Sequence, residues 1–202
     1  MTPLNEQAYN YLQKLIMENH FSYQEVYSET KLSKELGISR TPLRDAVHRL
    51  AQEGYIDIIP SKGFMLHQMN RKDVNETFQV RSALETYCTV QISKASSTRK
   101  AKKLFKELDW IMECMNDIME TTHSIKEFSE YDFQFHTKII DYLENEQFSN
   151  VFAMFMYRMK RLAELSLAHK GRMEQTYKEH MAILNCMKNG DTSRIYEITL
   201  KH

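Results

Sequence analysis

The sequence predicts a mostly α-helical protein of two domains, with residues 1–70 ending in a small β-hairpin and residues 71–202 helical throughout. Three observations lead to this fold class. The 202 residues include only 5 Gly and 3 Pro, which favours long helices joined by few turns. Apolar residues recur at helical spacing along most of the chain. Strand-like runs stand out at 55–59 and 64–67, with a turn sequence between them.

Composition excludes several classes of protein. Hydrophobic residues make up 42% and charged residues 27% of the chain, which is typical of a globular protein and not of a disordered or collagen-like one. No run of about 18 apolar residues is present, so we expect no membrane-spanning helix. The first six residues lack the basic and apolar regions of a secretory signal. Three cysteines without a Cys-x-x-Cys pair argue against a disulfide framework and favour a cytoplasmic location.

Net charge gives no indication of a polyanionic partner. The chain has 27 Lys and Arg and 27 Asp and Glu. Basic and acidic residues are also nearly balanced within residues 1–70. The basic residues there are Lys14, Lys31, Lys34, Arg40, Arg44, Arg49 and Lys62. The acidic residues are Glu6, Glu18, Glu25, Glu29, Glu35, Asp45, Glu53 and Asp57. A nucleic-acid function must therefore rest on where individual charges are placed.

Two helices are expected before residue 38. The first spans about residues 5–19 and carries an apolar stripe made of Ala8, Leu12, Leu15 and Ile16. Ser28 can cap a short second helix, and Gly37 ends it, as glycine commonly does at a helix C-terminus. The two helices leave an aromatic, irregular stretch between them.

A third helix and a hairpin complete the first domain. Ser39 or Thr41 caps the helix, and Pro42 lies in its first turn, where a missing N–H costs nothing. Its apolar stripe consists of Leu43, Ala46, Val47 and Leu50. Gly54 stops the helix, and the strand-like runs that follow predict a β-hairpin.

Three helices followed by a hairpin make a winged helix-turn-helix, although an ordinary pair of packed helices is the alternative for residues 28–53. The exposed face of the third helix favours DNA binding because it carries Thr41, Arg44, Asp45, His48 and Gln52, with Arg40 and Arg49 on its flanks. Arginine and hydroxyl side chains near a helix N-terminus suit phosphate and guanine contacts. Lys62 and Gly63 at the wing tip add a cation and a backbone that can approach a groove closely.

The segment from Leu36 to Leu50, with its core Ser-Arg-Thr-Pro-Leu-Arg, together with Glu53-Gly54-Tyr55-Ile56 and Lys62-Gly63-Phe64, resembles the GntR family of bacterial transcription regulators. The resemblance covers residues 4–69. It implies that the chain contacts operator DNA through Ser39, Arg40, Thr41, Arg44 and Arg49, with Lys62 and Gly63 in the minor groove.

Six helices are expected in the second domain, at residues 71–94, 98–120, 125–143, 146–168, 172–189 and 192–202. Ser124 and Glu127 have the spacing of a capping box before the third of them. Gly190 ends the fifth, and Asp191 begins the last. The pattern predicts an all-helical bundle.

Polar residues interrupt the apolar stripes of this bundle. Asp132 and His136 lie four residues apart on the inward face of the third helix, and His180 and His202 lie on the stripes of the fifth and sixth. A lone buried histidine is more often a hydrogen-bonded core residue than a metal ligand. Leaving four such groups unpaired would cost on the order of 1–3 kcal/mol each. One divalent ion would satisfy all four at once.

Arg81 raises a related question. It shares a helix face with Val74, Phe78, Leu84, Glu85 and Cys88. A buried arginine needs an anionic partner. An internal ion pair with Glu85 or another carboxylate and a role in binding an anionic ligand are equally compatible with this position.

Residues 80–85, 132–136 and 179–184, continuing to His202, resemble the FCD effector-binding domain of the FadR subfamily within GntR. The resemblance implies one ion held by Asp132, His136, His180 and His202, and an effector carboxylate bound by Arg81. Zn²⁺ or Ni²⁺ is expected first, with Mn²⁺ or Co²⁺ as alternatives. Family members usually continue beyond the last histidine, whereas His202 is the final residue here. Either the sequence is cut short after His202 or the last ligand lies on a fraying terminus, so we expect its contribution to be the least secure.

These features together predict a cytoplasmic bacterial transcription regulator that binds operator DNA as a homodimer, responds to a small organic acid and has no membrane partner. One alternative is a metal-dependent enzyme acting on a small carboxylate, since one Asp and three His can hold Zn²⁺ with an open position. No HExxH motif or pair of carboxylates supplies a general base, so we expect no enzymatic activity. A second alternative is a regulator whose metal is purely structural.

Overall fold

The structure is a computed structural model that describes residues 2–202. The chain divides into two compact units, of which the first ends at Asn70 and the second begins at Arg71. We call residues 2–70 the winged unit and residues 71–202 the helical unit. The predicted fold class is confirmed, because helices dominate both units and the described strands form one small hairpin in the winged unit.

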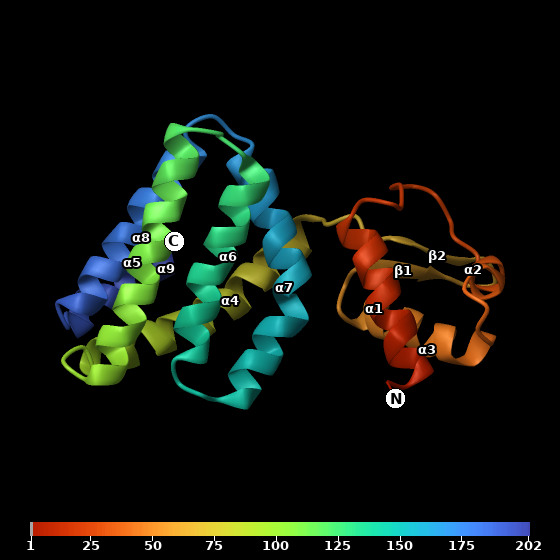
Figure 1. Ribbon diagram of the computed structural model, residues 1–202, viewed down its shortest axis with the longest axis horizontal. Helices are drawn as coiled ribbons and strands as arrows, with labels where there is room; N and C mark the ends of the chain where they lie inside the picture. Colours follow the sequence, from red (N-terminus) through yellow and green to blue (C-terminus); the bar gives the residue numbers. More distant parts are fainter. Residues whose placement is uncertain (1) are drawn as a thin grey trace. The chain divides into compact units, whose positions relative to one another are not determined.

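The winged unit consists of three helices and an antiparallel hairpin (Figure 1). Its elements are α1 (Leu4–Met17), α2 (Glu29–Glu35), α3 (Arg40–Gln52), β1 (Ile56–Ile59) and β2 (Gly63–Leu66). Helix α1 packs along α3, where Leu12 and Leu50 are fully buried, and β1 packs against α3. The strand register runs from Ile56 opposite Leu66 to Ile59 opposite Gly63.

Helix ends in the winged unit lie close to their predicted positions. Ser28 and Ser39 occupy the N-cap positions of α2 and α3, although neither side chain hydrogen-bonds to its helix. Gly37 and Gly54 follow these helices with φ of 65° and 78°, a conformation that glycine adopts without strain. The polypeptide can therefore turn sharply after each helix.

Gly63 at the wing is needed both for its backbone conformation and for the lack of a side chain. Its φ is 134°, and a Cβ at this position would overlap the carbonyl oxygen of Tyr27. Tyr27 and Phe64 exchange two backbone hydrogen bonds of 2.7 and 3.0 Å, so the segment before α2 pairs with the hairpin. The glycine thus allows the wing to pack against its own chain, in addition to any approach to DNA.

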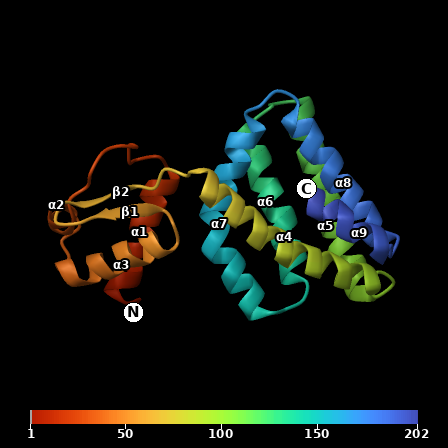
Figure 2. The ribbon, with the colours of Figure 1, turned by 180° about the vertical axis from the view of Figure 1, so that it is seen from behind.

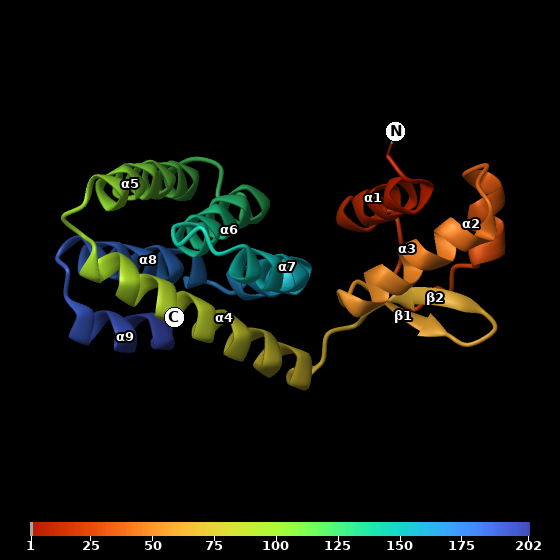
Figure 3. The same cartoon turned by 90° about the horizontal axis from the view of Figure 1, so that it is seen from below.

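The helical unit contains α4 (Arg71–Lys94), α5 (Arg99–Glu120), α6 (Ile125–Asp141), α7 (Glu146–Leu167), α8 (Arg172–Lys188) and α9 (Thr192–Lys201). Figures 1 and 2 view it from opposite sides and show α5, α6, α7 and α8 side by side, with α4 crossing them on one face. Helix α9 packs against α4 and α8, and Figure 3 shows α4 and α9 on the side of the unit away from α5.

Several helices of this unit begin at capping side chains that accept hydrogen bonds from first-turn amides, namely Thr98, Ser124, Asn145 and Asp191. The interior is mainly apolar, with Leu108, Phe128 and Phe135 fully buried. Polar residues from α4, α6 and α8 are buried in the same interior, which positions the site described next. Within residues 2–202 no helix has both the length and the apolar character needed to cross a membrane.

Candidate metal centre and nucleic-acid interface

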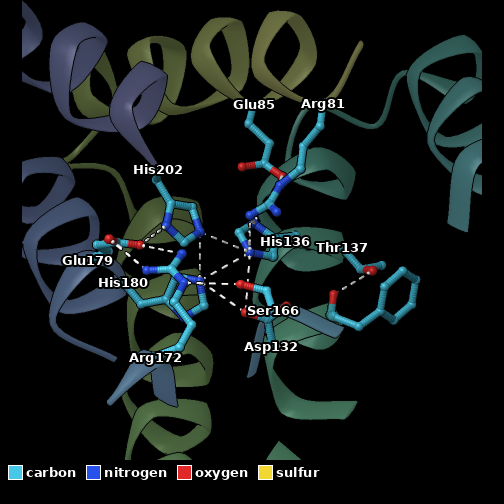
Figure 4. A network of polar contacts seen from close by, with 11 residues as sticks. Arg81, Glu85, Asp132, His136, Thr137, Ser166, Arg172, Glu179, His180 and His202 are labelled. Carbon is cyan, nitrogen blue, oxygen red and sulfur yellow. Dashed lines mark hydrogen bonds and ion pairs between the residues drawn. The ribbon is translucent and has the colours of Figure 1, made fainter. Parts of the chain in front are cut away.

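Three histidines from three different helices meet inside the helical unit (Figure 4). His136 lies on α6, His180 on α8, and His202 directly follows α9. Their Nε2 atoms are 3.1 Å apart for His136 and His180, 3.0 Å for His180 and His202, and 3.4 Å for His136 and His202. All three side chains are at least nine-tenths buried. We call these three residues the histidine triad.

The nitrogen spacing of the triad fits a divalent metal ion. Imidazole nitrogens bind Zn²⁺ at about 2.0–2.1 Å, so two of them would lie about 3.0 Å apart at a right angle and about 3.4 Å apart at the tetrahedral angle. The observed separations cover the same range. Each Nε2 carries either a proton or a lone pair, so three of them in mutual contact cannot all be satisfied by one another. A shared cation would accept all three lone pairs.

Carboxylates orient two of the three rings. Nδ1 of His136 lies 2.9 Å from Oε1 of Glu85, and Nδ1 of His202 lies 2.8 Å from Oε2 of Glu179. A proton donated from each Nδ1 to its carboxylate leaves a lone pair on Nε2, which is the usual support of a metal-ligating histidine. At His136 this lone pair accepts from Nη2 of Arg81 at 2.6 Å, so an ion would have to displace that hydrogen bond. The His180 ring is held differently, stacked on Phe135 with centroids 4.2 Å apart.

Asp132 lies beside the triad on α6. Its Oδ1 is 3.4 Å from Nε2 of His180 and 3.8 Å from Nε2 of His136, and the residue is 7% exposed. Burial alone would raise the pKa of Asp132, but the neighbouring His136, His180 and Arg81 hold it below its usual range. A carboxylate therefore lies beside the same centre, 3.4 Å from the nearest of the three Nε2 atoms.

The protonation of the triad favours metal binding at two of its members. Burial, reinforced by neighbouring cationic groups, lowers the pKa of His180 well below its ordinary value. Burial also lowers the pKa of His202, against the opposing effect of Glu179. Both rings are then neutral near pH 7, as a metal ligand must be. At His136, burial and Arg81 lower the pKa, but the Glu85 and Asp132 carboxylates outweigh them and raise it.

Arg81 on α4 lies next to the triad, as Figure 4 shows. Its Nε donates to Oε1 of Glu85 at 2.8 Å, and its Nη2 lies 2.6 Å from Nε2 of His136. Burial would raise the pKa of Glu85, but Arg81 and His136 outweigh it and hold that pKa at about 2. The internal ion pair considered for Arg81 is therefore present. The second role also stays open, because Arg81 lines a cavity.

This cavity, of about 40 Å³, lies beside the triad. Its polar lining includes Arg81, Asp132 and His202, and Met159, Leu162 and Leu167 of α7 supply apolar walls. We call it the effector cavity after the role that is proposed for it below.

Two further residues of the site were not predicted from the sequence, Arg172, which lines the effector cavity, and Glu179, which contacts His202. Arg172 at the start of α8 makes a bidentate ion pair with Glu179, with N–O distances of 3.0 and 3.1 Å. Glu179 in turn holds the His202 ring. Burial would raise the pKa of Glu179, but His202 and Arg172 outweigh it and hold that pKa at about 2. The seven-residue spacing of Arg172 and Glu179, two helical turns, is the signal that could have found them.

A separate cleft of about 210 Å³ lies in the winged unit, between the start of α2, the start of α3 and the wing. Arg40, Arg44, Lys62 and Gly63 all line it. Ser39 and Thr41 are exposed at the N-terminus of α3 nearby, although they are not part of the lining. The side chain of Arg44 is 55% exposed and lies 3.7 Å from Glu29.

Arg49 is placed differently from the other predicted DNA contacts. Its guanidinium bonds to Glu6 at 3.0 Å and to Glu53 at 3.1 Å, and it stacks over the Tyr9 ring at 3.7 Å. It does not line the winged-unit cleft, as far as residues 2–202 define it. These contacts tie α1 to α3 and give Arg49 a structural role inside the unit.

Comparison with protein families matches both parts of the chain. The profile of the FCD domain matches residues 76–202, and the profile of bacterial regulatory proteins of the gntR family matches residues 4–66. An uncharacterized HTH-type transcriptional regulator of Bacillus subtilis, YdhC, is 25% identical over 100% of this chain and 88% of that protein. The HTH-type transcriptional repressor RspR of Escherichia coli is 22% identical over 99% of this chain and 86% of that protein.

Solved structures show the same fold. McbR/YncC of E. coli is 16% identical, with a TM-score of 0.72 over 100% of this chain and 95% of that one. A putative GntR regulator from Rhodococcus sp. RHA1 is 12% identical, with a TM-score of 0.71 over 96% and 90% of the two chains. The named relatives are transcriptional regulators rather than enzymes.

Proposed function

The chain belongs to the GntR family of bacterial regulatory proteins, in the group with an FCD domain, and from this premise we propose that it is a metal-containing, acid-responsive repressor or activator that binds operator DNA as a dimer. The observation that carries the proposal is the convergence of three buried Nε2 atoms beside a cavity that Arg81 lines.

For the DNA interface, we assign base and phosphate contacts to the winged-unit cleft and the adjacent N-terminus of α3. Arg44 is exposed and would read a base edge, and Arg40 and Lys62 are cations on either side of the cleft. Ser39 and Thr41 present hydroxyls beside the free amides of the first turn of α3, which is a favourable place for a phosphate. Arg49 would contribute by stabilising the unit, because its guanidinium already has two carboxylate partners.

For the dimer, we assign contacts to an uncharged groove of about 670 Å³ on α4 and α9. Phe78, Tyr87, Tyr196 and Leu200 line this groove and are each 40–53% exposed. Small residues, Ser82 and Ala83, lie between Phe78 and Tyr87 along α4, so two copies of the helix could approach closely there. A dimer would read two half-sites about one helical turn apart, which a single recognition helix cannot do.

For the metal, we assign the histidine triad and Asp132 as ligands of one divalent ion. When bound, the ion would supply open coordination positions for the oxygens of a carboxylate. Glu85 and Glu179 would hold the rings of His136 and His202 in place. Arg81 would form an ion pair with the carboxylate of the effector.

For the response, the effector would link α4 to α6, α8 and α9 through Arg81, Asp132 and the triad. Helix α4 begins at Arg71, directly after the winged unit. An acid that binds one arrangement of α4 better than another can shift DNA affinity by a coupling of typically 1–3 kcal/mol. The proposal requires this difference in affinity, since an acid that binds both arrangements equally would leave the equilibrium between them unchanged.

The experiment is a binding selection on random duplex DNA, followed by titration of the selected site with Zn²⁺-loaded protein. We expect a palindromic or nearly palindromic site, and an affinity that changes when an acid found by thermal-shift screening is added. A Zn²⁺-loaded protein that selects no site, or whose DNA affinity is the same with every acid that binds it, would contradict the proposal.

A further inference from the structure

The effector cavity is lined by few charged residues, and each of them has a partner. Arg81 pairs with Glu85 at 2.8 Å, and Arg172 pairs with Glu179. Asp132 is the remaining carboxylate, and its nearest neighbours are histidines of the triad. Two guanidinium groups and three carboxylates give this cluster a formal charge of minus one when the imidazoles are neutral.

A neighbouring lysine does not alter this charge. Lys160 on α7 lines a small space that shares Arg81 and Asp132 with the effector cavity. Its Nζ lies 2.7 Å from Oε2 of Glu130, so the two charges cancel as a pair. A divalent ion on the triad would therefore bring the cluster to plus one, and one carboxylate would bring it to zero. A second carboxylate would leave a net negative charge in a buried site, which is unfavourable without a further partner.

The wall of the cavity also contains a polar group without a partner. Oγ1 of Thr77 is buried and has no hydrogen-bond partner among the described residues, and Thr77 is only 1% exposed. Thr77 lines the effector cavity four residues before Arg81, so the two share one face of α4. A ligand whose carboxylate pairs with Arg81 could bring a nearby hydroxyl to Thr77. A buried hydroxyl left unpaired costs free energy, so this contact would discriminate between ligands.

The size of the cavity sets an upper limit on the ligand. Its volume of about 40 Å³ is water-accessible space. A space of this size can hold ordered water or a small ligand. This excludes long-chain acids unless α7 moves.

We propose that the effector is a short acid with a single carboxylate and at least one hydroxyl, selected by the charge balance of the cavity and by Thr77. The inference rests on the proposed function, because it takes the triad to hold a divalent ion and the cavity to hold an acid. It adds two selection rules, one for the charge of the ligand and one for its hydroxyl.

The test uses three acids on the same three-carbon skeleton, propionate, lactate and hydroxymalonate, titrated into full-length Zn²⁺-loaded protein by calorimetry. Lactate has one carboxylate and one hydroxyl, propionate lacks the hydroxyl, and hydroxymalonate adds a second carboxylate. We expect lactate to bind at least tenfold more tightly than either of the others. The metal content of the protein is measured after each titration, so that removal of Zn²⁺ by hydroxymalonate is not counted as binding.

Two variants separate the two rules. Thr77→Val keeps the shape of the side chain, so it should retain Zn²⁺ and reduce the preference for lactate over propionate to less than threefold. Leu162→Lys adds a positive charge to the apolar wall, so it should raise the affinity for hydroxymalonate relative to lactate by at least tenfold. Neither residue supplies a ligand atom of the triad.

The possible failures are distinguishable. Tighter binding of hydroxymalonate or propionate than of lactate to the wild-type protein overturns this inference but leaves the acid-responsive function in place. An unchanged preference in Thr77→Val overturns the hydroxyl rule. Binding of none of the three acids to protein that carries Zn²⁺ overturns the inference, and failure of a broader acid screen would then contradict the proposed function as well.

Discussion

The two arginines at the centres of the two candidate sites are held in opposite ways. In the winged unit, the Arg44 side chain is 55% exposed and lies 3.7 Å from a single carboxylate, Glu29. In the helical unit, the Arg81 side chain is 15% exposed, bonds to Glu85 at 2.8 Å and contacts His136. Exposed ion pairs contribute about 0–1 kcal/mol, so Arg44 can exchange Glu29 for DNA at little cost. Arg81 is fixed before any ligand arrives.

This difference indicates how each site would work. A flexible, exposed cation suits a long polyanion that brings many contacts, each of modest strength. A buried cluster whose charged groups are held in ion pairs suits a small ligand, because fixed groups lose little entropy when the ligand binds. Substitutions in the helical unit should therefore have larger effects on their ligand than substitutions in the winged unit have on DNA.

The largest effect is expected from His136→Ala. Removing a ligand and its ring from the triad should weaken Zn²⁺ binding by on the order of a thousandfold, more than the 10–100-fold loss typical of outer-sphere changes. The measurement is competition with a chromophoric chelator at pH 7.5. His169→Ala is the matched control, since His169 is exposed in the connection between α7 and α8. Equal Zn²⁺ affinity in the two variants would mean that His136 contributes no more to Zn²⁺ binding than an exposed histidine does, which would contradict its assignment as a ligand.

Arg44→Ala should have the next largest effect. Loss of a bidentate base contact costs about 1–3 kcal/mol, so affinity for the selected DNA site should fall about 5–150-fold. Fluorescence anisotropy with the selected duplex measures the change. Arg49→Ala is the comparison, and it should lower thermal stability through loss of its contacts with Glu6, Glu53 and Tyr9. If Arg49→Ala weakened DNA binding more than Arg44→Ala without loss of stability, the assignment of the interface would be wrong.

Glu179→Gln should reduce Zn²⁺ affinity about 10–100-fold, because a neutral amide supports the His202 ring less well than a carboxylate does. The same chelator competition gives the value. Gln175→Ala, which removes another partner of Glu179 without touching His202, serves as the control and should change the affinity less than threefold. An effect of Gln175→Ala as large as that of Glu179→Gln would show that the helix, and not the carboxylate, was disturbed.

The smallest expected effect is a change in acid sensitivity. The pKa of Glu85 falls from an ordinary 4.5 to about 2 in the folded protein, so the unfolded chain binds more protons between these pH values. Stability from this group is present above pH 4.5 and is lost as pH falls toward 2. Thermal unfolding can be followed by the fluorescence of Trp110 of α5, the one tryptophan of the chain. We expect the melting temperature to depend less steeply on pH, between pH 4.5 and 2, in Glu85→Gln than in the wild-type protein. An identical slope in both proteins would contradict the ionised, buried state of Glu85.

Local sequence patterns predicted most of the helices well. Helix α8, for example, was expected at 172–189 and runs from Arg172 to Lys188, because its apolar spacing and the following Gly190 are local signals. The wing was placed to within a residue for the same reason. The pairing of Tyr27 with Phe64 could not be predicted, since it joins residues far apart in sequence through backbone atoms alone.

The candidate site was predictable only in part. His136, His180 and His202 could be selected because each is a polar residue on an apolar stripe. Of the supporting carboxylates, Glu85 was considered only as a partner of Arg81, and Glu179 was missed because it lies on a helix face that the sequence marks as polar. The expectation that His202 is the least secure ligand rested on its place as the final residue. In the structure Glu179 holds its ring at 2.8 Å, and the side chain is 3% exposed. Tertiary contacts of this kind leave no periodic signal in the sequence.

The most direct test of the central claim is the metal content of the full-length protein. Protein is dialysed to equilibrium against a low concentration of Zn²⁺ or Ni²⁺ and then analysed for metal and for chain concentration. The account predicts about one equivalent of metal per chain, because a buried triad with oriented lone pairs binds a single ion. Less than about a tenth of an equivalent, which is roughly the noise of such an assay, would contradict it.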